Sequence, residues 1–214
     1  MDIDQKISVE QTVYDFRQFT NGKKYRTIYA DPPWQFQNRT GKVAPEHKRL
    51  SRYGTMKLDE IKQLPVNEVA ADKCHLYLWV PNALLPEGLE VMRAWGFEYK
   101  TNIIWEKVRK DGMPDGRGVG FYFRNVTEIL LFGIKGDKNR TLDQGRTQVN
   151  LIRSMKREHS RKPDEFVSLI EGILWSMSNL QTYIYGISPV VNATEVNASI
   201  TYYKLKKVNR HEKT

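Results

Sequence analysis

The chain has 214 residues, a formal net charge of +9 and a pI near 9.5, with 40% hydrophobic and 11% aromatic residues. This composition supports one domain with a buried core and excludes an intrinsically disordered chain. The single cysteine, Cys74, excludes an internal disulfide framework. The excess of positive charge favours a polyanionic partner, most commonly nucleic acid; a basic protein without such a partner is the alternative.

The residues that could mark a compartment or a metal site are few. The N-terminal stretch "MDIDQKISVEQ" is acidic and polar, unlike a signal peptide, and no apolar run reaches the roughly 18 residues of a membrane span. We therefore expect a soluble, cytoplasmic protein. The four histidines are scattered and lack metal-ligand spacing, so we expect no metal site.

Strand and helix patterns alternate along the chain. Runs of branched and aromatic residues that stop at turn signals predict strands at residues 25–31, 75–80, 101–108, 127–135, 148–155 and 181–187. Helical spacing of apolar residues predicts helices at residues 57–65, 86–95 and 162–173. The alternation predicts an α/β fold with a mixed, mostly parallel sheet flanked by helices. Ligands of such sheets bind at the carboxyl ends of the strands, so the residues after each strand are candidate site residues.

The first predicted strand ends in an unusual sequence, "TIYADPPWQF" at residues 27–36. Proline fixes its own φ and disfavours helical geometry in the preceding residue, so Asp31-Pro32-Pro33 is predicted to be a stiff turn. The turn presents a carboxylate, backbone carbonyls and the ring of Trp34 together. A planar heterocycle with an amino group matches this set, because its ring can stack while its N–H groups donate to oxygen. The alternative is a plain strand-ending turn with Trp34 in the core.

The same turn suits a reaction at the amino nitrogen. An aromatic amine is a weak nucleophile because its lone pair is delocalised into the ring. Acceptors placed for a pyramidal nitrogen favour the transition state over the ground state. The "DPPW" sequence after a strand resembles the catalytic motif of methyltransferases that transfer methyl from S-adenosylmethionine to amino groups.

The resemblance extends over residues 25–171 and is to the MT-A70 family of N6-adenine methyltransferases. The similar blocks are "ADPPW" (30–34), "YGTM" (53–56), "LYLWV" (76–80), "WGFEY" (95–99), "IIWEK" (103–107), "TEILLFGIKG" (127–136) and "HSRKPDEF" (159–166). It implies a Rossmann-like methyltransferase fold, S-adenosylmethionine as the cofactor and adenine N6 as the target, with DNA favoured over RNA. A restriction-modification or phage role is implied too, and a homodimer or a heterodimer with a related subunit is an expectation of the same kind.

Site residues follow from the resemblance block by block. Asp31 would contact the target amino group and the methionine amine; Pro32 would accept an N6 hydrogen, next to Pro33, and Trp34 would wall the base pocket. Tyr53 and Glu128 would complete that pocket, although a turn residue and an edge charge are the plain alternatives. The cofactor side would include Ser160 and Lys162 and, from the more distant similarity of "YDFRQF" (14–19), Asp15 and the Phe16 backbone.

The basic stretch at residues 37–52 lies between two of these blocks and lacks apolar periodicity. It is expected to hold the phosphates that flank the target, unless it is a solvated loop without a ligand. The residues proposed to bind nucleic acid are Arg39, Lys42, Lys48, Arg49 and Arg52.

The pattern departs from the family after about residue 172, where the expected contacts to the cofactor ribose are missing. A shifted reading frame and true divergence both explain the departure, and either would impair cofactor binding. The predicted organisation is an N-terminal segment (1–24), a methyltransferase domain (25–187) and a basic tail (188–214). A non-catalytic, nucleic-acid-binding relative is the competing hypothesis.

Overall fold

A computed structural model describes residues 9–35, 55–116, 122–141, 143–156, 162–174 and 183–185. Its centre is a six-stranded sheet with the strand order β5-β3-β4-β2-β1-β6. The strands are β1 (Tyr25–Ala30), β2 (Ala70–Val80), β3 (Glu98–Val108), β4 (Thr127–Lys135), β5 (Leu151–Met155) and β6 (Tyr183–Tyr185). The helices are α1 (Val9–Thr20), α3 (Leu58–Lys62), α4 (Val66–Val69), η1 (Asn82–Leu84), α5 (Leu85–Ala94), α6 (Asp143–Arg146) and α7 (Asp164–Leu174).

The sheet is mixed, and β4 is its one reversed strand among the described residues. β1 runs parallel to β2 and β6, and β3 runs parallel to β5, whereas β4 is antiparallel to both β2 and β3. Parallel neighbours need a long crossover connection, which is usually a helix. No helix lies in the described part of the connection between β3 and β4, which agrees with their antiparallel pairing. The predicted mixed, mostly parallel α/β sheet is confirmed.

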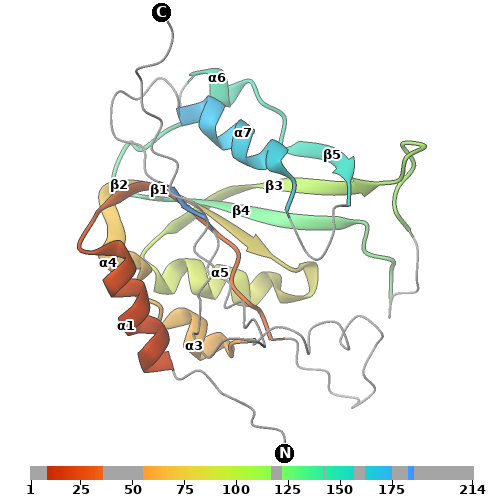
Figure 1. Cartoon of the computed structure of the whole chain (residues 1–214). Helices are drawn as coiled ribbons and strands as arrows, with labels where there is room; N and C mark the ends of the chain where they lie inside the picture. The colour runs from red at the N-terminus through yellow and green to blue at the C-terminus, as the bar shows by residue number, and fades with distance from the viewer. Residues whose placement is uncertain are drawn as a thin grey trace, which may run out of the picture.

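Helices cover both faces of the sheet, as Figure 1 shows, with α7 on one side and α3 and α5 on the other. The first core cluster joins Phe16 of α1, Ile61 of α3 and Met92 of α5 to the strands. The second cluster joins Phe166 and Ile170 of α7 to the opposite face. Alternation along β2 explains both clusters, because Leu76, Leu78 and Val80 point into the first and Tyr77 and Trp79 into the second.

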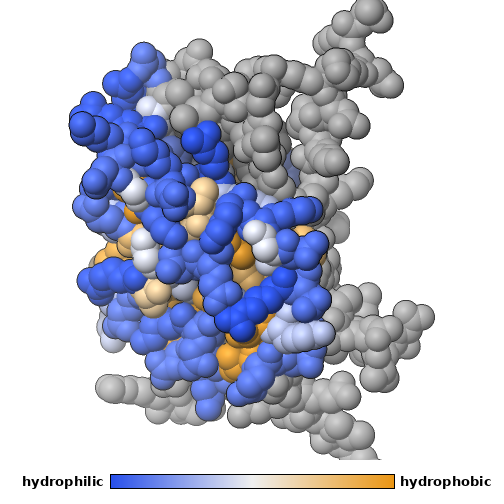
Figure 2. Space-filling view, turned by 90° about the vertical axis from the view of Figure 1, so that its left-hand side faces the viewer, coloured by the Kyte–Doolittle hydropathy of each residue, from blue (hydrophilic) through white to orange (hydrophobic). Residues whose placement is uncertain are grey.

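Helix α1 packs on the domain although the sequence patterns did not predict it. Phe16 is buried in the first core cluster, and the guanidinium of Arg17 forms a two-pronged ion pair with Glu68 of α4. Figure 2 shows the face at the left of Figure 1, where α1 and α4 lie, and hydrophilic residues cover most of its described part. Within the described ranges, no helix is long and apolar enough to cross a membrane.

The remaining predicted elements match closely, with boundaries that differ by a few residues. β2 begins at Ala70, five residues before the predicted strand. The sequence did not indicate this extension, because Ala71–Lys73 are polar or small and show little apolar alternation. The short elements α4, η1 and α6 were not predicted, since four residues or fewer carry no helical period. The predicted boundaries of the N-terminal segment and the C-terminal tail remain predictions.

Candidate active site

The turn that follows β1 is held by backbone hydrogen bonds. The Trp34 N–H donates to the Pro32 carbonyl at 2.9 Å, and the Met56 N–H donates to the Pro33 carbonyl at 2.8 Å. Trp34 and Met56 also form an isolated parallel bridge, which anchors the far end of the turn. A carbonyl oxygen has two lone pairs, so Pro32 keeps one for a further donor. The turn is therefore rigid and still offers an acceptor beside Asp31.

Trp34 is buried rather than open to solvent. Its side chain is 6% exposed and belongs to the first core cluster, and its indole N–H donates to the Trp79 carbonyl at 2.9 Å. This bond ties the turn to the end of the neighbouring strand β2. The position agrees with the plain alternative of a core tryptophan, and a role as a wall of the base pocket remains a prediction.

Four charged side chains form a row along the carboxyl edge of the sheet. The ammonium of Lys162 lies 3.6 Å from an Asp31 oxygen and 2.8 Å from a Glu128 oxygen. The ammonium of Lys107 lies 2.6 Å from the other Glu128 oxygen. Negative and positive groups thus alternate from the end of β1 through Lys162, two residues before α7, to β4 and β3. All four are at least two-thirds buried, so these pairs are less screened than surface ion pairs.

Both lysines of the row lie above tryptophan rings. Lys162 is 4.9 Å from the centroid of the Trp79 ring, and Lys107 is 5.2 Å from that of Trp105. An ammonium over an indole face is favoured by the ring quadrupole, more strongly where water is excluded. The rings of Trp79 and Trp105 meet edge to face, with 6.2 Å between centroids. The two ammonium groups therefore lie over two tryptophan rings that pack against each other.

Helix α7 fixes the position of Lys162. Pro163 follows the lysine and its carbonyl accepts the Phe166 N–H at 3.2 Å, which closes the first turn of the helix. Phe166 is fully buried and packs edge to face against Trp79 at 4.7 Å between ring centroids. The same packing that seats the helix on the sheet thus places the lysine between the two carboxylates.

The two carboxylates have opposite pKa shifts. Burial raises the pKa of Asp31; Lys162 opposes this rise and Glu128 adds to it. Burial would also raise the pKa of Glu128, but Lys162 and Lys107 together outweigh it and lower that pKa. Burial would lower the pKa of Lys162, yet Asp31 and Glu128 outweigh it and raise that pKa. Glu128 is therefore the firmly ionised carboxylate, and Asp31 is the more basic one.

Asp31, Glu128 and Lys162 were all proposed from the sequence, and the structure brings them together. Glu128 is not an isolated edge charge, and Lys162 is not a solvated lysine before a helix, because each has two charged partners. Their roles in a reaction remain predictions. The other proposed residues of the base pocket, cofactor site and basic loop lie outside the described residues: Tyr53, Ser160, Arg39, Lys42, Lys48, Arg49 and Arg52.

Asp15 and Phe16 lie within α1, and no hydrogen bond or ion pair among the described residues joins them to Asp31. The Asp15 carboxylate accepts a hydrogen bond from Gln11 at 2.7 Å on the exposed side of the helix. The Phe16 carbonyl accepts one from the Thr20 hydroxyl at 2.9 Å, inside the helix. Their assignment to the cofactor adenine stays a prediction, although a backbone inside a helix has little hydrogen-bonding capacity left for a ligand.

The sequence analysis missed Lys107, Trp79 and Trp105 as site residues. Each lies in a block that resembles the family, "LYLWV" or "IIWEK", but was not assigned a role in the site. Trp105 and Lys107 are two apart on β3, so both side chains point to the same face of the sheet. Glu128 pairs in register with Trp105 across the antiparallel β3–β4 ladder. The two-residue spacing of Trp105 and Lys107 could therefore have indicated that Lys107 lies on the same face of the sheet as Trp105. It points to Glu128 only once the register of β3 and β4 is known.

Comparisons with known proteins agree with this geometry. The MT-A70 family model matches residues 25–190. The chain belongs to the MT-A70 family. The match continues to residue 190, past residue 172, after which the individual motifs no longer resemble those of the family.

Relatives of the chain occur in bacteria, plants and animals. A type II methyltransferase of a Mycoplasma species, M.MunI, is 32% identical over 166 residues, which are 71% of this chain and 66% of that protein. A putative N(6)-adenosine-methyltransferase of Medicago truncatula is 35% identical over 156 residues, 70% of this chain and 22% of that protein. The human N(6)-adenosine-methyltransferase catalytic subunit METTL3 is 32% identical over 150 residues, 69% and 23% of the two chains. The chain thus spans about two thirds of the bacterial relative and under a quarter of the others.

MT-A70 methyltransferases use S-adenosylmethionine as the methyl donor. The described residues fit the amino-acid end of this molecule, which carries an ammonium and a carboxylate. Asp31 would be the anion for the ammonium and Lys162 the cation for the carboxylate; the two side chains lie 3.6 Å apart. The indole N–H of Trp79 is buried and has no hydrogen-bond partner among the described residues, so it is a further donor beside Lys162.

Proposed function

We propose that this protein transfers a methyl group from S-adenosylmethionine to N6 of adenine in DNA. The observation that carries the proposal is the position of Asp31. It lies in a rigid turn at the carboxyl end of β1 and its pKa is raised, beside a second carboxylate that two lysines hold ionised. Two carboxylates with pKa values shifted in opposite directions indicate different tasks for the two groups.

The cofactor supplies a methyl group on a positively charged sulfur, which leaves with the electron pair of the broken carbon–sulfur bond. As N6 forms its bond to that carbon, positive charge develops on the nitrogen. Asp31 would accept a hydrogen bond from N6 and stabilise that charge, and the remaining lone pair of the Pro32 carbonyl would accept the second N6 hydrogen. A carboxylate of raised pKa is the stronger acceptor, so Asp31 is better suited than Glu128 to this task. The methylated nitrogen would then release one proton to water and return to a neutral amine.

Glu128 and the two lysines would set the geometry. Lys162 bridges the carboxylates, so it would fix the distance between them. Orientation of this kind contributes several kcal/mol to a bimolecular reaction, roughly 7–11 kcal/mol in the best cases. In a duplex the adenine must leave the stack before N6 can be reached, and Trp34 and Tyr53 are the proposed contacts of the extruded base.

DNA is proposed over RNA because the matched region makes up most of the bacterial relative and only a small part of the others. The match covers 66% of the Mycoplasma type II methyltransferase but at most 23% of the two relatives named N(6)-adenosine-methyltransferase that are described above. A site-specific modification enzyme, with or without a restriction partner, is the form of the function that this relative favours. A related subunit as dimer partner belongs to the same proposal.

The second candidate is a nucleic-acid-binding partner without methyltransferase activity. It rests on the loss of motif resemblance after about residue 172, which removes the expected contacts to the cofactor ribose. The intact row of Asp31, Lys162 and Glu128 favours the enzyme instead, because a subunit that only binds nucleic acid has no need of two partly buried carboxylates at one edge.

A competition assay tests the proposed substrate. Duplex DNA and single-stranded RNA of equal adenine content are mixed with the protein and methyl-labelled S-adenosylmethionine, and the label in each polymer is measured. We expect the label in DNA, in excess over RNA, because the site would act on an extruded base held by a duplex backbone.

Label chiefly in RNA would overturn the DNA assignment and keep the reaction. Label in neither polymer, together with no heat of binding when S-adenosylmethionine is titrated into the protein, would favour the non-catalytic partner. The same protein sample with Asp31→Asn serves as the blank for contaminating methyltransferases.

A further inference from the structure

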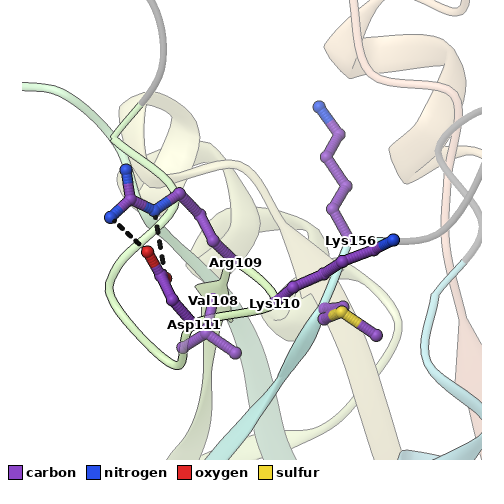
Figure 3. Close-up of a pocket in the computed structure, with 6 residues that line it drawn as sticks. Val108, Arg109, Lys110, Asp111 and Lys156 are labelled. Carbon is purple, nitrogen blue, oxygen red and sulfur yellow. Dashed lines mark hydrogen bonds and ion pairs between the residues drawn. The ribbon is translucent and has the colours of Figure 1, made fainter.

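A second candidate site lies where β3 and β5 end. A hollow of about 470 Å³ is lined by residues from the two strand ends and the loop after β3: Val108, Arg109, Lys110, Asp111, Met155 and Lys156. Figure 3 shows Lys110 and Lys156 extending over the hollow from two different segments and Arg109 paired with Asp111. None of these residues belongs to the blocks that suggested the family, and none was proposed from the sequence.

The hollow is basic and prearranged. Its three cationic side chains and one carboxylate leave a formal charge of +2. The Arg109 guanidinium is oriented by two hydrogen bonds to Asp111, of 3.2 and 2.8 Å, and Asp111 also accepts the Met113 N–H at 3.0 Å. Lys110 and Lys156 are exposed and have no ion-pair partner among the described residues. Two free ammonium groups are therefore available to an anion.

The hollow shares an edge of the sheet with the candidate active site. β3 and β5 point in the same direction as β1, so Val108, Met155 and Asp31 all lie at carboxyl ends of strands. Lys107, which binds Glu128, is the residue immediately before the lining residue Val108. From β3 to β1 there are three interstrand steps. At about 4.8 Å each they amount to roughly 14 Å, or about four steps of a duplex strand at ~3.4 Å.

We propose that this hollow binds the phosphate backbone of the nucleic acid whose adenine enters the active site, about four nucleotides from that adenine. The inference rests on the proposed function, whose substrate it locates on the protein surface. Lys110 and Lys156 contact phosphate oxygens, and Arg109, held by Asp111, contributes its remaining N–H groups. The exposed Met155 side chain offers apolar surface beside the charges for a sugar.

A charge-neutralised double variant, Lys110→Ala/Lys156→Ala, tests the site. The matched control is Lys23→Ala/Lys73→Ala, which removes two exposed lysines near the amino ends of β1 and β2, at the opposite edge of the sheet. Both double variants lose the same net charge. Binding of a fluorescent DNA duplex is titrated over a series of salt concentrations for the wild type and both variants, without cofactor, so that no catalytic step is needed.

We expect the hollow variant to flatten the log–log salt dependence by about 1.8, because each lost duplex phosphate contact is worth about 0.9. Relative to equal binding at 1 M salt, that slope corresponds to roughly 60-fold weaker binding near 0.1 M salt. The control variant should keep the wild-type slope. The binding of S-adenosylmethionine should be equal in all three proteins, because the hollow contains none of the proposed cofactor residues.

Equal slopes for the hollow variant and the control would overturn the proposal, since net charge alone would then explain the binding. Failure of the proposed function gives a different pattern: no methylation by the wild type, with the slope difference between the two variants intact. Titration with inorganic phosphate separates the sources of the ligand. Saturable phosphate binding that does not compete with the duplex would also overturn the assignment to a nucleic-acid backbone.

Discussion

Replacing Asp31 with asparagine is expected to abolish methylation without destabilising the fold. The change removes the charged acceptor at N6, which should lower the rate at least 100-fold, since one such group is worth a few kcal/mol in the transition state. The raised pKa of Asp31 means that folding disfavours its ionised form, so a neutral isostere should unfold at the same or a higher temperature. Methylation rates and thermal unfolding midpoints of the two proteins measure both effects.

The sign of the pH dependence follows from the same shift. A carboxyl group whose folded-state pKa is raised contributes stability at pH values below its unfolded pKa and loses that contribution as the pH rises through the folded value. The ionised form is nevertheless the one that accepts from N6. Methylation should therefore fall, on acidification, at a pH above the usual range of an aspartate.

Asp72→Asn is the matched control, because Asp72 is exposed near the start of β2, at the opposite edge of the sheet. It should leave the methylation rate unchanged. A methylation rate for Asp31→Asn within a few-fold of the wild type would remove Asp31 from the reaction. A clearly lower unfolding temperature would mean that the ionised form of Asp31 stabilises the fold, which a raised pKa does not allow.

Replacing Lys162 with methionine is the change expected to cost the most stability. Methionine keeps most of the apolar contact with Trp79 but leaves the Asp31 and Glu128 carboxylates close together without the cation that bridges them. Breaking a fully buried pair costs about 3–5 kcal/mol, and partial exposure here reduces the expected loss to about 2 kcal/mol at neutral pH. Denaturant unfolding of the variant and the wild type measures this loss.

The loss should be relieved by acid. Without Lys162 the pKa values of both carboxylates rise, so protonation of either one removes the repulsion, and the stabilities of variant and wild type should converge as the pH falls. Lys107→Met is the comparison, because it removes a cation of the same row yet leaves Lys162 bridging Asp31 and Glu128. A stability difference that is constant with pH would show that packing, and not charge, explains the effect of Lys162→Met.

Much of the fold could be predicted because its signals are local. The strand that ends at Ala30 stops at an acid and two prolines, and α7 begins after Pro163 with Asp164 and Glu165 in its first turn. Helix α1 was missed since it is stabilised by distant partners, the core around Phe16 and the Arg17–Glu68 ion pair. The reversed direction of β4 was readable in principle, because no helix was predicted between it and β3.

In the candidate site, too, residues with local sequence signals were predicted and residues that depend on distant contacts were not. Asp31 and Lys162 stand next to prolines, whose fixed geometry is visible in the sequence, and both were proposed. Lys107 and Trp79 act through contacts across strands, and their importance depends on the register and on which face of the sheet each residue takes. The hollow at the ends of β3 and β5 joins residues more than 40 positions apart, which no local pattern indicates.

Identification of the methylated nucleoside tests the central claim most directly. The wild type and Asp31→Asn are incubated with duplex DNA and methyl-labelled S-adenosylmethionine, the DNA is digested to nucleosides, and the labelled product is identified by mass spectrometry. The account predicts N6-methyldeoxyadenosine as the labelled product of the wild type and none from Asp31→Asn. Label on another base, or equal amounts of N6-methyldeoxyadenosine from both proteins, would contradict it.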